Sequence, residues 1–415
     1  MNNDGLKGDI KMTKFADRIV PIPEGGVMSK IFAAFDYPDA LSLGDGVPDA
    51  STFPVQELKA MTIEAFDEAD DPVINNVLFS YLDGGYPKLK EFIFDRCMNK
   101  YNTGNPEMDS IQLFGGAQQL IDLVAKIYCN PGDTIIVEDS SYGGAIFSFE
   151  EYQANVVGVP IDEHGIIPEA LEETLKREKN VKFIYVIPTF SNPTGIEMSL
   201  ERRKAVYDLA VKYDVMIFED SPYFELRYSG DYIPTIKSMD TTGHVIFAGS
   251  LSKIICPGIR IGYAIGPKPV MDAILNGKIN NDISGPGIIQ VAVAKYLEKY
   301  DLDAHIAECC DLYRTKRDAM LAALEREMGD IATWTHPEGG FFLWLTIPEG
   351  LSGKDFAVYV AEKKHVVLYP GANYHPKGED VNAVRLNFSV PTEDQIDDCI
   401  KKVGDALKEF IELNK

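Results

Sequence analysis

The sequence predicts an α/β protein with a mostly parallel sheet of seven strands, because short apolar runs alternate with helical patterns along most of the chain. The runs share a content of β-branched and aromatic residues and end at Phe114, Val137, Val159, Ile187, Phe218, Phe247 and Ile265. Helical patterns lie between several of them, at 118–128, 168–176 and 199–213. In the third pattern Leu200, Val206 and Leu209 fall on one helix face. Strands that alternate with helices are typical of a parallel sheet flanked by helices on both faces.

The last third of the sequence has a different pattern. A long helix is expected at 305–328, then a strand at 339–345, a helix at 354–364, two more strand pieces and a final helix. This order predicts a small α+β unit. A chain of 415 residues is long enough for about two domains. We therefore expect a large domain at 51–299 and a small domain made of 1–50 and 300–415.

Composition and charge exclude several classes of protein. The formal net charge of −24 disfavours binding to nucleic acid or to an anionic membrane surface, since both require a basic face. No apolar run reaches membrane-spanning length, and the first twenty residues lack the apolar core of a signal peptide. The six cysteines form no CxxC pair and show no metal-ligand spacing. The sequence therefore predicts a cytoplasmic protein with reduced thiols and without a metal site.

The segment 249–263 carries the strongest chemical signal. Lys253 lies between Ser252 and a glycine-containing turn, with Ser250 before it and Arg260 after it. Serine hydroxyls donate to phosphate oxygens, and a guanidinium group binds phosphate through two parallel hydrogen bonds. A lone lysine is usually a solvated surface charge, but that interpretation weakens when four such residues lie between two apolar strands. The segment therefore predicts an anchored phosphate with an amine close by.

Three further segments follow predicted strands directly. Asp220 follows the run DVMIF, where a buried carboxylate is stable only beside a cation; capping of the next helix is the alternative. The glycines at 115–116 precede a helix, whose first N–H groups bind anions. The Asn-Pro-Thr-Gly sequence at 192–195 is, taken alone, ordinary turn chemistry. In an open α/β sheet ligands lie at the carboxyl ends of the strands, so these segments are expected to form one site.

Together these segments resemble the fold-type I aminotransferases that depend on pyridoxal 5′-phosphate (PLP), known as aminotransferase class I and II. The resemblance covers nearly the whole chain in the family's order. Its motifs are GDGVPD, YLDGGYPKLKEFI, GGAQQ, SYGG, SNPTG, EDSPY, SLSKIICPGIRIGY, EGGFFLW and VRLNFS. In finer detail the chain looks like the 2-aminoadipate and aromatic aminotransferases. The resemblance implies an aspartate-aminotransferase-like fold, with a large PLP-binding domain and a small α+β domain.

The resemblance also implies a role for each residue that matches the motifs. Lys253 would hold PLP as an imine and later move a proton, and Asp220 would pair with the pyridine nitrogen. Tyr223 and Asn192 would hydrogen-bond the ring oxygen, while Tyr142 would stack on the ring. The phosphate would be held by Gly116, Ala117, Gln118, Ser250, Ser252 and Arg260.

Substrate and partner contacts follow from the same resemblance. Arg385 would bind the substrate α-carboxylate, helped by Asn192 and by the backbone of Gly46. Tyr81 is similar to the tyrosine that reaches the phosphate of a neighbouring subunit, which implies a homodimer. Asp45, beside Gly46, departs from the apolar or small residues of relatives and either repels an acidic side chain or points to solvent.

The implied activity is the transfer of the amino group of an L-amino acid to a 2-oxo acid, with 2-oxoglutarate as the expected acceptor, by ping-pong chemistry. Three alternatives remain open at this point. The same fold and cofactor serve PLP-dependent lyases, decarboxylases and ACC-synthase-like enzymes. Related domains also bind effectors in transcription regulators, and a catalytically inactive binding protein is the third alternative.

Overall fold

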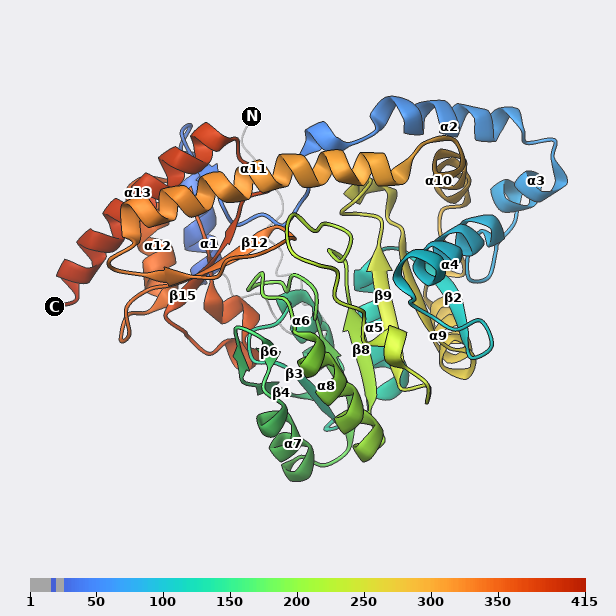
Figure 1. Ribbon diagram of the computed structural model, residues 1–415, viewed down its shortest axis with the longest axis horizontal. Helices are drawn as coiled ribbons and strands as arrows, with labels where there is room; N and C mark the ends of the chain where they lie inside the picture. Colours follow the sequence, from blue (N-terminus) through green and yellow to red (C-terminus); the bar gives the residue numbers. More distant parts are fainter. Residues whose placement is uncertain (1–15, 20–25) are drawn as a thin grey trace, which may run out of the picture.

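The computed structural model describes residues 16–19 and 26–415, and its centre is a seven-stranded sheet (Figure 1). The strand order is β2-β10-β9-β8-β7-β3-β4. The strands are β2 (Asp109–Phe114), β3 (Thr134–Glu138), β4 (Asn155–Val159), β7 (Val181–Val186), β8 (Met216–Asp220), β9 (Val245–Ser250) and β10 (Gly262–Pro267). Strand β10 is antiparallel to β2 and β9, whereas the other neighbouring pairs are parallel. The predicted α/β class with a mostly parallel seven-stranded sheet is confirmed.

Helices cover both faces of this sheet because its strands are apolar on both faces. Ile135 and Val137 of β3 pack in one core cluster, which includes α5 (Ala117–Tyr128), α6 (Gly143–Glu151) and α9 (Lys268–Asp282). Ile136, between them, packs in a second cluster with α7 (Pro168–Arg177) and α8 (Leu200–Tyr213). Successive strand residues point to opposite faces, so one strand contributes to both cores. A short hairpin of β5 (Ile161–Asp162) and β6 (Gly165–Ile166) lies before α7.

A second, four-stranded antiparallel sheet forms near the C-terminus. Its order is β11 (Thr333–Trp334), β12 (Phe342–Thr346), β15 (Ala383–Asn387) and β14 (Tyr369–Pro370). Around it lie α1 (Val27–Phe32), α12 (Gly353–Lys364) and α13 (Glu393–Leu413) (Figure 1). Strand β1 (Leu41–Ser42) pairs in parallel with β13 (Val366–Val367), so an N-terminal segment packs with C-terminal elements. The exact domain boundaries predicted from the sequence stay a prediction.

Helix α11 (Leu302–Met328) runs from beside α12 and α13 toward α10 (Gly287–Lys299) (Figure 1). Helices α2 (Val55–Asp67), α3 (Pro72–Phe79) and α4 (Pro87–Tyr101) pack against α10. The helix begins three residues before the predicted position 305, because the Asp301 carboxylate caps it by accepting from the N–H groups of Asp303 and Ala304. None of the helices in the described ranges combines the length and the apolar character that a membrane span requires.

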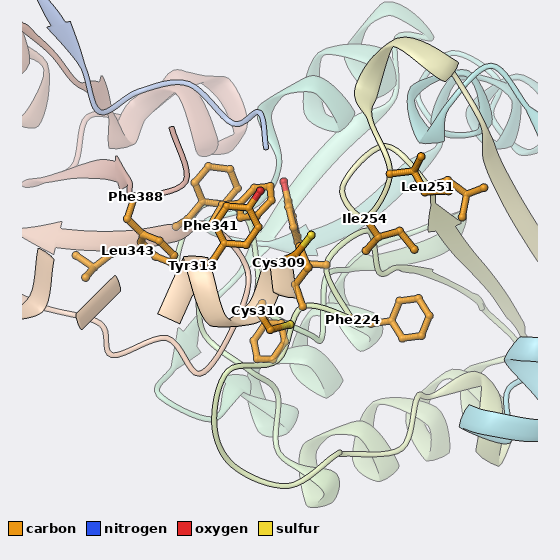
Figure 2. Packing of buried hydrophobic residues seen from close by; sticks show 14 of the residues in the cluster. Phe224, Leu251, Ile254, Cys309, Cys310, Tyr313, Phe341, Leu343 and Phe388 are labelled. Carbon is orange, nitrogen blue, oxygen red and sulfur yellow. The ribbon is translucent and has the colours of Figure 1, made fainter. Parts of the chain in front are cut away.

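Apolar side chains of α11 pack against both the C-terminal sheet and the loop that follows β9 of the central sheet. Tyr313 of α11 packs against Phe341, with ring centroids 4.9 Å apart, and both side chains are fully buried. Figure 2 shows Cys309 and Cys310 of the same helix among this packing, with Ile254 on the loop that follows β9. One contiguous core therefore holds that loop, α11 and the C-terminal sheet together.

A buried ion cluster lies at the amino ends of two strands of the central sheet, β2 and β9. The Lys237 ammonium group lies 2.7 Å from a carboxylate oxygen of Asp109 and 2.9 Å from one of Asp240, and it donates to the carbonyl of Val245 at 3.1 Å. All three charged side chains are completely buried. Asp109 and Val245 begin β2 and β9, so the cluster joins the amino ends of these two strands.

Replacing Lys237 tests how much this cluster contributes to stability. Lys237→Met leaves two buried carboxylates without their cation, and we expect the free energy of unfolding to fall by about 3–5 kcal/mol. Urea denaturation of the purified variant measures this change. The matched control is Lys212→Met, which removes a lysine that is 60% exposed in its pair with Glu172 and should change stability little. A Lys237 variant as stable as this control would contradict the importance of the cluster.

Candidate active site

The carboxyl ends of four adjacent strands, β3, β7, β8 and β9, meet at one edge of the central sheet. Asp220 and Ser250 end β8 and β9, and Tyr142, Asn192 and Lys253 lie in the loops after β3, β7 and β9. Because these strands are parallel, residues far apart in the sequence gather at this edge. The structure therefore brings together most of the residues singled out from the sequence.

Asp220 is the last residue of β8 and is 3% exposed. One carboxylate oxygen, Oδ2, accepts a hydrogen bond from the Tyr185 hydroxyl at 2.7 Å. The other, Oδ1, is buried and has no hydrogen-bond partner within residues 16–19 and 26–415. Burial raises the pKa of this carboxyl to about 6, against the opposing effects of Tyr185 and Lys253. A turn rather than a helix follows Asp220, so its alternative interpretation as a helix cap is wrong.

Lys253 lies in the loop after β9. Its ammonium group donates to the carbonyl of Gly46 at 2.7 Å and stands 5.6 Å from the centre of the Tyr223 ring. Burial lowers the pKa of Lys253 to about 8, and the positive charges of Arg385 and Arg260 act in the same direction. A neutral lysine is a nucleophile and a base, so this environment suits a reactive amine.

An anion site forms where β2 leads into α5. Gly116 has φ +89°, and a Cβ atom there would lie 2.2 Å from the Arg260 guanidinium, so only glycine fits. Arg260 donates to the carbonyl of Gly115 at 2.8 Å. The first N–H groups of α5, at Ala117 and Gln118, have no partner inside the helix. The Arg260 guanidinium and the first N–H groups of α5 thus lie at the same turn.

Two serines, Ser250 and Ser252, lie at the end of β9 and in the loop that follows it. Ser250 ends β9, and its hydroxyl accepts from the N–H of Ser252 at 3.2 Å. The Ser252 hydroxyl is buried and has no hydrogen-bond partner in the described part of the chain. A buried hydroxyl without a partner costs free energy, so a ligand oxygen that accepts from it would stabilise the site.

Arg385, on β15, enters the site from the C-terminal sheet. Its guanidinium donates to the Asn192 side-chain oxygen at 2.7 Å and also to the carbonyl of Gly44. Three aromatic rings surround it and were not singled out from the sequence: Phe342 at 4.1 Å, Tyr374 at 4.8 Å and Tyr369 at 5.3 Å. The cation is 4% exposed and its Nε–H has no partner within the described ranges.

Two tyrosines complete the inner part of the site. Tyr142 is the residue before α6, and its hydroxyl donates to the Gln118 side chain at 3.1 Å. Tyr223 is 3% exposed and packs edge-on against Phe341 and Phe342, with centroids 5.4 Å and 5.6 Å away. Both phenol rings are thereby held by neighbours, which fixes their orientation toward the site.

Two residues of the sequence motifs, Tyr81 and Asp45, and one residue outside the motifs, Tyr185, need separate comment. Tyr81 lies between α3 and α4, is 77% exposed and takes no part in the site of the single chain. Asp45 is half-buried. The pKa of Tyr369 is raised mainly by the burial of Tyr369 and further by the negative charge of Asp45. Tyr185 was not singled out from the sequence. The alternation of residues in the strand VKFIYVI predicts which face of the sheet the Tyr185 side chain lies on, but it does not predict the hydrogen bond to Asp220.

The donors and acceptors present fit PLP. The unpaired Asp220 oxygen suits a protonated ring nitrogen, which is a cation that burial would otherwise exclude. Arg260, Ser252 and the first turn of α5 offer the donors that a phosphate needs. Lys253 supplies the amine that reacts with an aldehyde. Two of these groups, Asp220 Oδ1 and the Ser252 hydroxyl, are buried and lack a hydrogen-bond partner among the described residues, so the cofactor would supply the partners that they need.

Comparison with known proteins gives the same result. The family model for aminotransferase class I and II matches residues 39–403. An aromatic-amino-acid aminotransferase of Thermococcus litoralis is 36% identical over 375 residues, which cover 89% of this chain and 88% of that protein.

Two solved structures are also similar to this chain. A multiple substrate aminotransferase from Thermococcus profundus has a TM-score of 0.91 at 33% identity and covers 96% of this chain and 98% of its own. A kynurenine aminotransferase from Pyrococcus horikoshii, solved with PMP, has a TM-score of 0.89 at 34% identity and covers 95% and 97%. The chain therefore belongs to the aminotransferase class I and II family and is a PLP-dependent transaminase.

Proposed function

We propose that the enzyme transfers the amino group of L-amino acids with aromatic or 2-aminoadipate-like side chains to 2-oxoglutarate, in the cytoplasm. The observation that carries the donor class is the set of rings around Arg385, formed by Phe342, Tyr369 and Tyr374. A donor whose carboxylate binds Arg385 has its side chain next to these rings, and apolar or aromatic groups gain free energy by leaving water there. The names of the T. litoralis and P. horikoshii relatives agree with the aromatic donors of this class.

We assign roles to the inner residues on their chemistry. When bound, PLP supplies an electron sink for the bond to the substrate α-carbon. Asp220 holds a proton-bearing ring nitrogen through its unpaired Oδ1, and Tyr223 and Asn192 donate to the ring oxygen. Lys253 anchors the cofactor and then, as a neutral amine, moves the proton from the substrate α-carbon. Its lowered pKa makes that neutral form available near neutral pH.

The outer residues position the reactants. Gly116, with the first N–H groups of Ala117 and Gln118, binds the phosphate together with Ser250, Ser252 and Arg260. Tyr142 covers one face of the ring. Arg385 binds the α-carboxylate of donor and acceptor alike, with Asn192 and the backbone of Gly46 beside it, because both substrates of a ping-pong reaction occupy the same site in turn.

We also propose a homodimer in which Tyr81 reaches the phosphate of the neighbouring subunit. The support is an apolar surface on the helices around this loop. Its large exposed side chains are Val55 at 58%, Ile63 at 53%, Phe66 at 57%, Val73 at 59% and Phe79 at 70%, with Tyr81 at 77%. Groups of exposed large apolar side chains are typical of protein interfaces, and a second copy of the chain would cover them.

Absorbance spectra of the purified enzyme with single amino acids test the donor class. Without a keto acid, an accepted donor should convert the visible band of the bound cofactor to the near-ultraviolet band of the pyridoxamine form. We expect phenylalanine, tyrosine, kynurenine and 2-aminoadipate to convert it faster than alanine or glycine. Adding 2-oxoglutarate should restore the visible band. Equal rates for glycine and tyrosine, or release of ammonia or CO₂, would contradict the proposal.

The lowered pKa of Lys253 predicts how the cofactor-free enzyme takes up PLP. With a pKa of about 8, about one tenth of the amine is neutral at pH 7, far more than for an ordinary lysine with a pKa of about 10.4. The uptake rate, followed by the appearance of the visible band, should therefore rise with pH and level off above about 8.

Arg385→Met should move this midpoint to higher pH, because it removes one of the positive charges that disfavour the ammonium form. The matched control is Arg326→Met, which changes an arginine that is 50% exposed on α11 and should leave the midpoint in place. Lys253→Ala should take up PLP without the visible band. A midpoint near 10 in the unmodified enzyme would show that the site does not lower this pKa.

Arg385→Ala should raise KM for every donor by about 10- to 100-fold, since a hydrogen bond to a charged group contributes about 1.5–3 kcal/mol. Steady-state kinetics with three donors of different side chain measure the effect. A rise for one donor alone would assign Arg385 to the side chain instead of the shared carboxylate. The Arg326→Ala variant should keep all three KM values unchanged.

A further inference from the structure

Asp220 depends on a residue that none of the sequence motifs includes. Tyr185 lies on β7, next to β8, and pairs in register with Phe218. Alternation along β8 places Phe218 and Asp220 on the same face, so the Tyr185 ring extends along the sheet toward the carboxylate. Its hydroxyl donates to Asp220 Oδ2 at 2.7 Å.

The Tyr185 ring is held rigidly. It packs edge-on against Phe149 of α6 and Phe218 of β8, with both centroid distances 5.4 Å. All three rings have no exposed surface. Burying a phenol hydroxyl costs free energy unless the hydroxyl has a hydrogen-bond acceptor. Asp220 is that acceptor for Tyr185. The fixed ring thus fixes the direction from which Oδ2 is approached.

The two oxygens of Asp220 are therefore not equivalent. Oδ2 is engaged by Tyr185, whereas Oδ1 is buried without a partner in the part of the chain that the structure describes. A hydrogen bond from a neutral donor also favours the ionised carboxylate over the protonated acid. Ionised Asp220 is the form that can accept from a protonated ring nitrogen.

We propose that Tyr185 is a positioning residue for Asp220: its hydroxyl holds Oδ2 and thereby directs Oδ1 at the ring nitrogen of the bound cofactor. This inference rests on the proposed role of Asp220. It makes Tyr185 part of the reaction machinery without contact to the substrate. Cofactor affinity and kcat should depend on the Tyr185 hydroxyl, whereas KM for the donor should not, because Arg385 is untouched.

The test is Tyr185→Phe, which keeps both ring contacts and removes only the hydroxyl. We expect the dissociation constant of PLP, measured by titrating the cofactor-free protein, to rise about tenfold or more, and kcat to fall by a similar factor. The matched control is Tyr263→Phe, on strand β10 of the same sheet. The buried Tyr263 hydroxyl accepts a weak contact from Cys97 Sγ at 3.7 Å and takes no part in the hydrogen bond to Asp220. A purely structural role would lower the melting temperature in both variants and leave PLP affinity unchanged. PLP affinity and kcat of Tyr185→Phe within twofold of the control would overturn the inference.

A double-mutant cycle separates this inference from the role on which it rests. If Tyr185 acts through Asp220, adding Tyr185→Phe to Asp220→Ala should cause no further loss of PLP affinity or kcat. Losses that multiply would show that Tyr185 acts independently and would overturn the inference alone. An Asp220→Ala variant with unchanged PLP affinity and kcat would instead remove the proposed role of Asp220.

Discussion

The site depends on one buried carboxylate, Asp220, of which one oxygen has a hydrogen-bond partner in the described part of the chain and the other has none. Asp220 ends a central strand, and its Oδ2 accepts a hydrogen bond from Tyr185, whereas its Oδ1 has no partner among residues 16–19 and 26–415. Burying a carboxylate is costly, and Tyr185 and Lys253 offset only part of that cost, so a bound cationic group beside Oδ1 would stabilise the site. Cofactor binding and folding stability are therefore coupled through this residue.

The charges of the site act on Lys253 in opposite directions. Arg260 and Arg385 both disfavour the ammonium form of Lys253, while Asp220 favours it. Burial adds to the effect of the arginines, and the net result is an amine that loses its proton more readily than a surface lysine. The same two cations bind the phosphate and the substrate carboxylate in our assignment. In this assignment Arg260 and Arg385 both bind the anionic groups of the ligands and lower the pKa of Lys253.

Much of this arrangement was predictable because it depends on local patterns. Each apolar run marked a strand, and the residues just after the runs at Tyr142, Asn192 and Asp220 gather at one edge, as parallel strands require. The sequence did not predict Tyr185 as a partner of Asp220, since register between neighbouring strands decides which side chains meet. The rings around Arg385 were missed for a similar reason: Phe342 and Tyr374 belong to separate segments whose packing is set by the fold.

Arg385 shows how the C-terminal sheet takes part in chemistry at the edge of the central sheet. Its guanidinium reaches the Asn192 side chain, 193 residues away in sequence, and the carbonyl of Gly44, 341 residues away. Without substrate, these neutral acceptors hold the guanidinium in place among three rings. A substrate carboxylate is a stronger acceptor because it carries a charge, so it can replace them without reorganising the pocket. The arginine is therefore positioned before the substrate arrives, and little of the binding free energy is needed to order it.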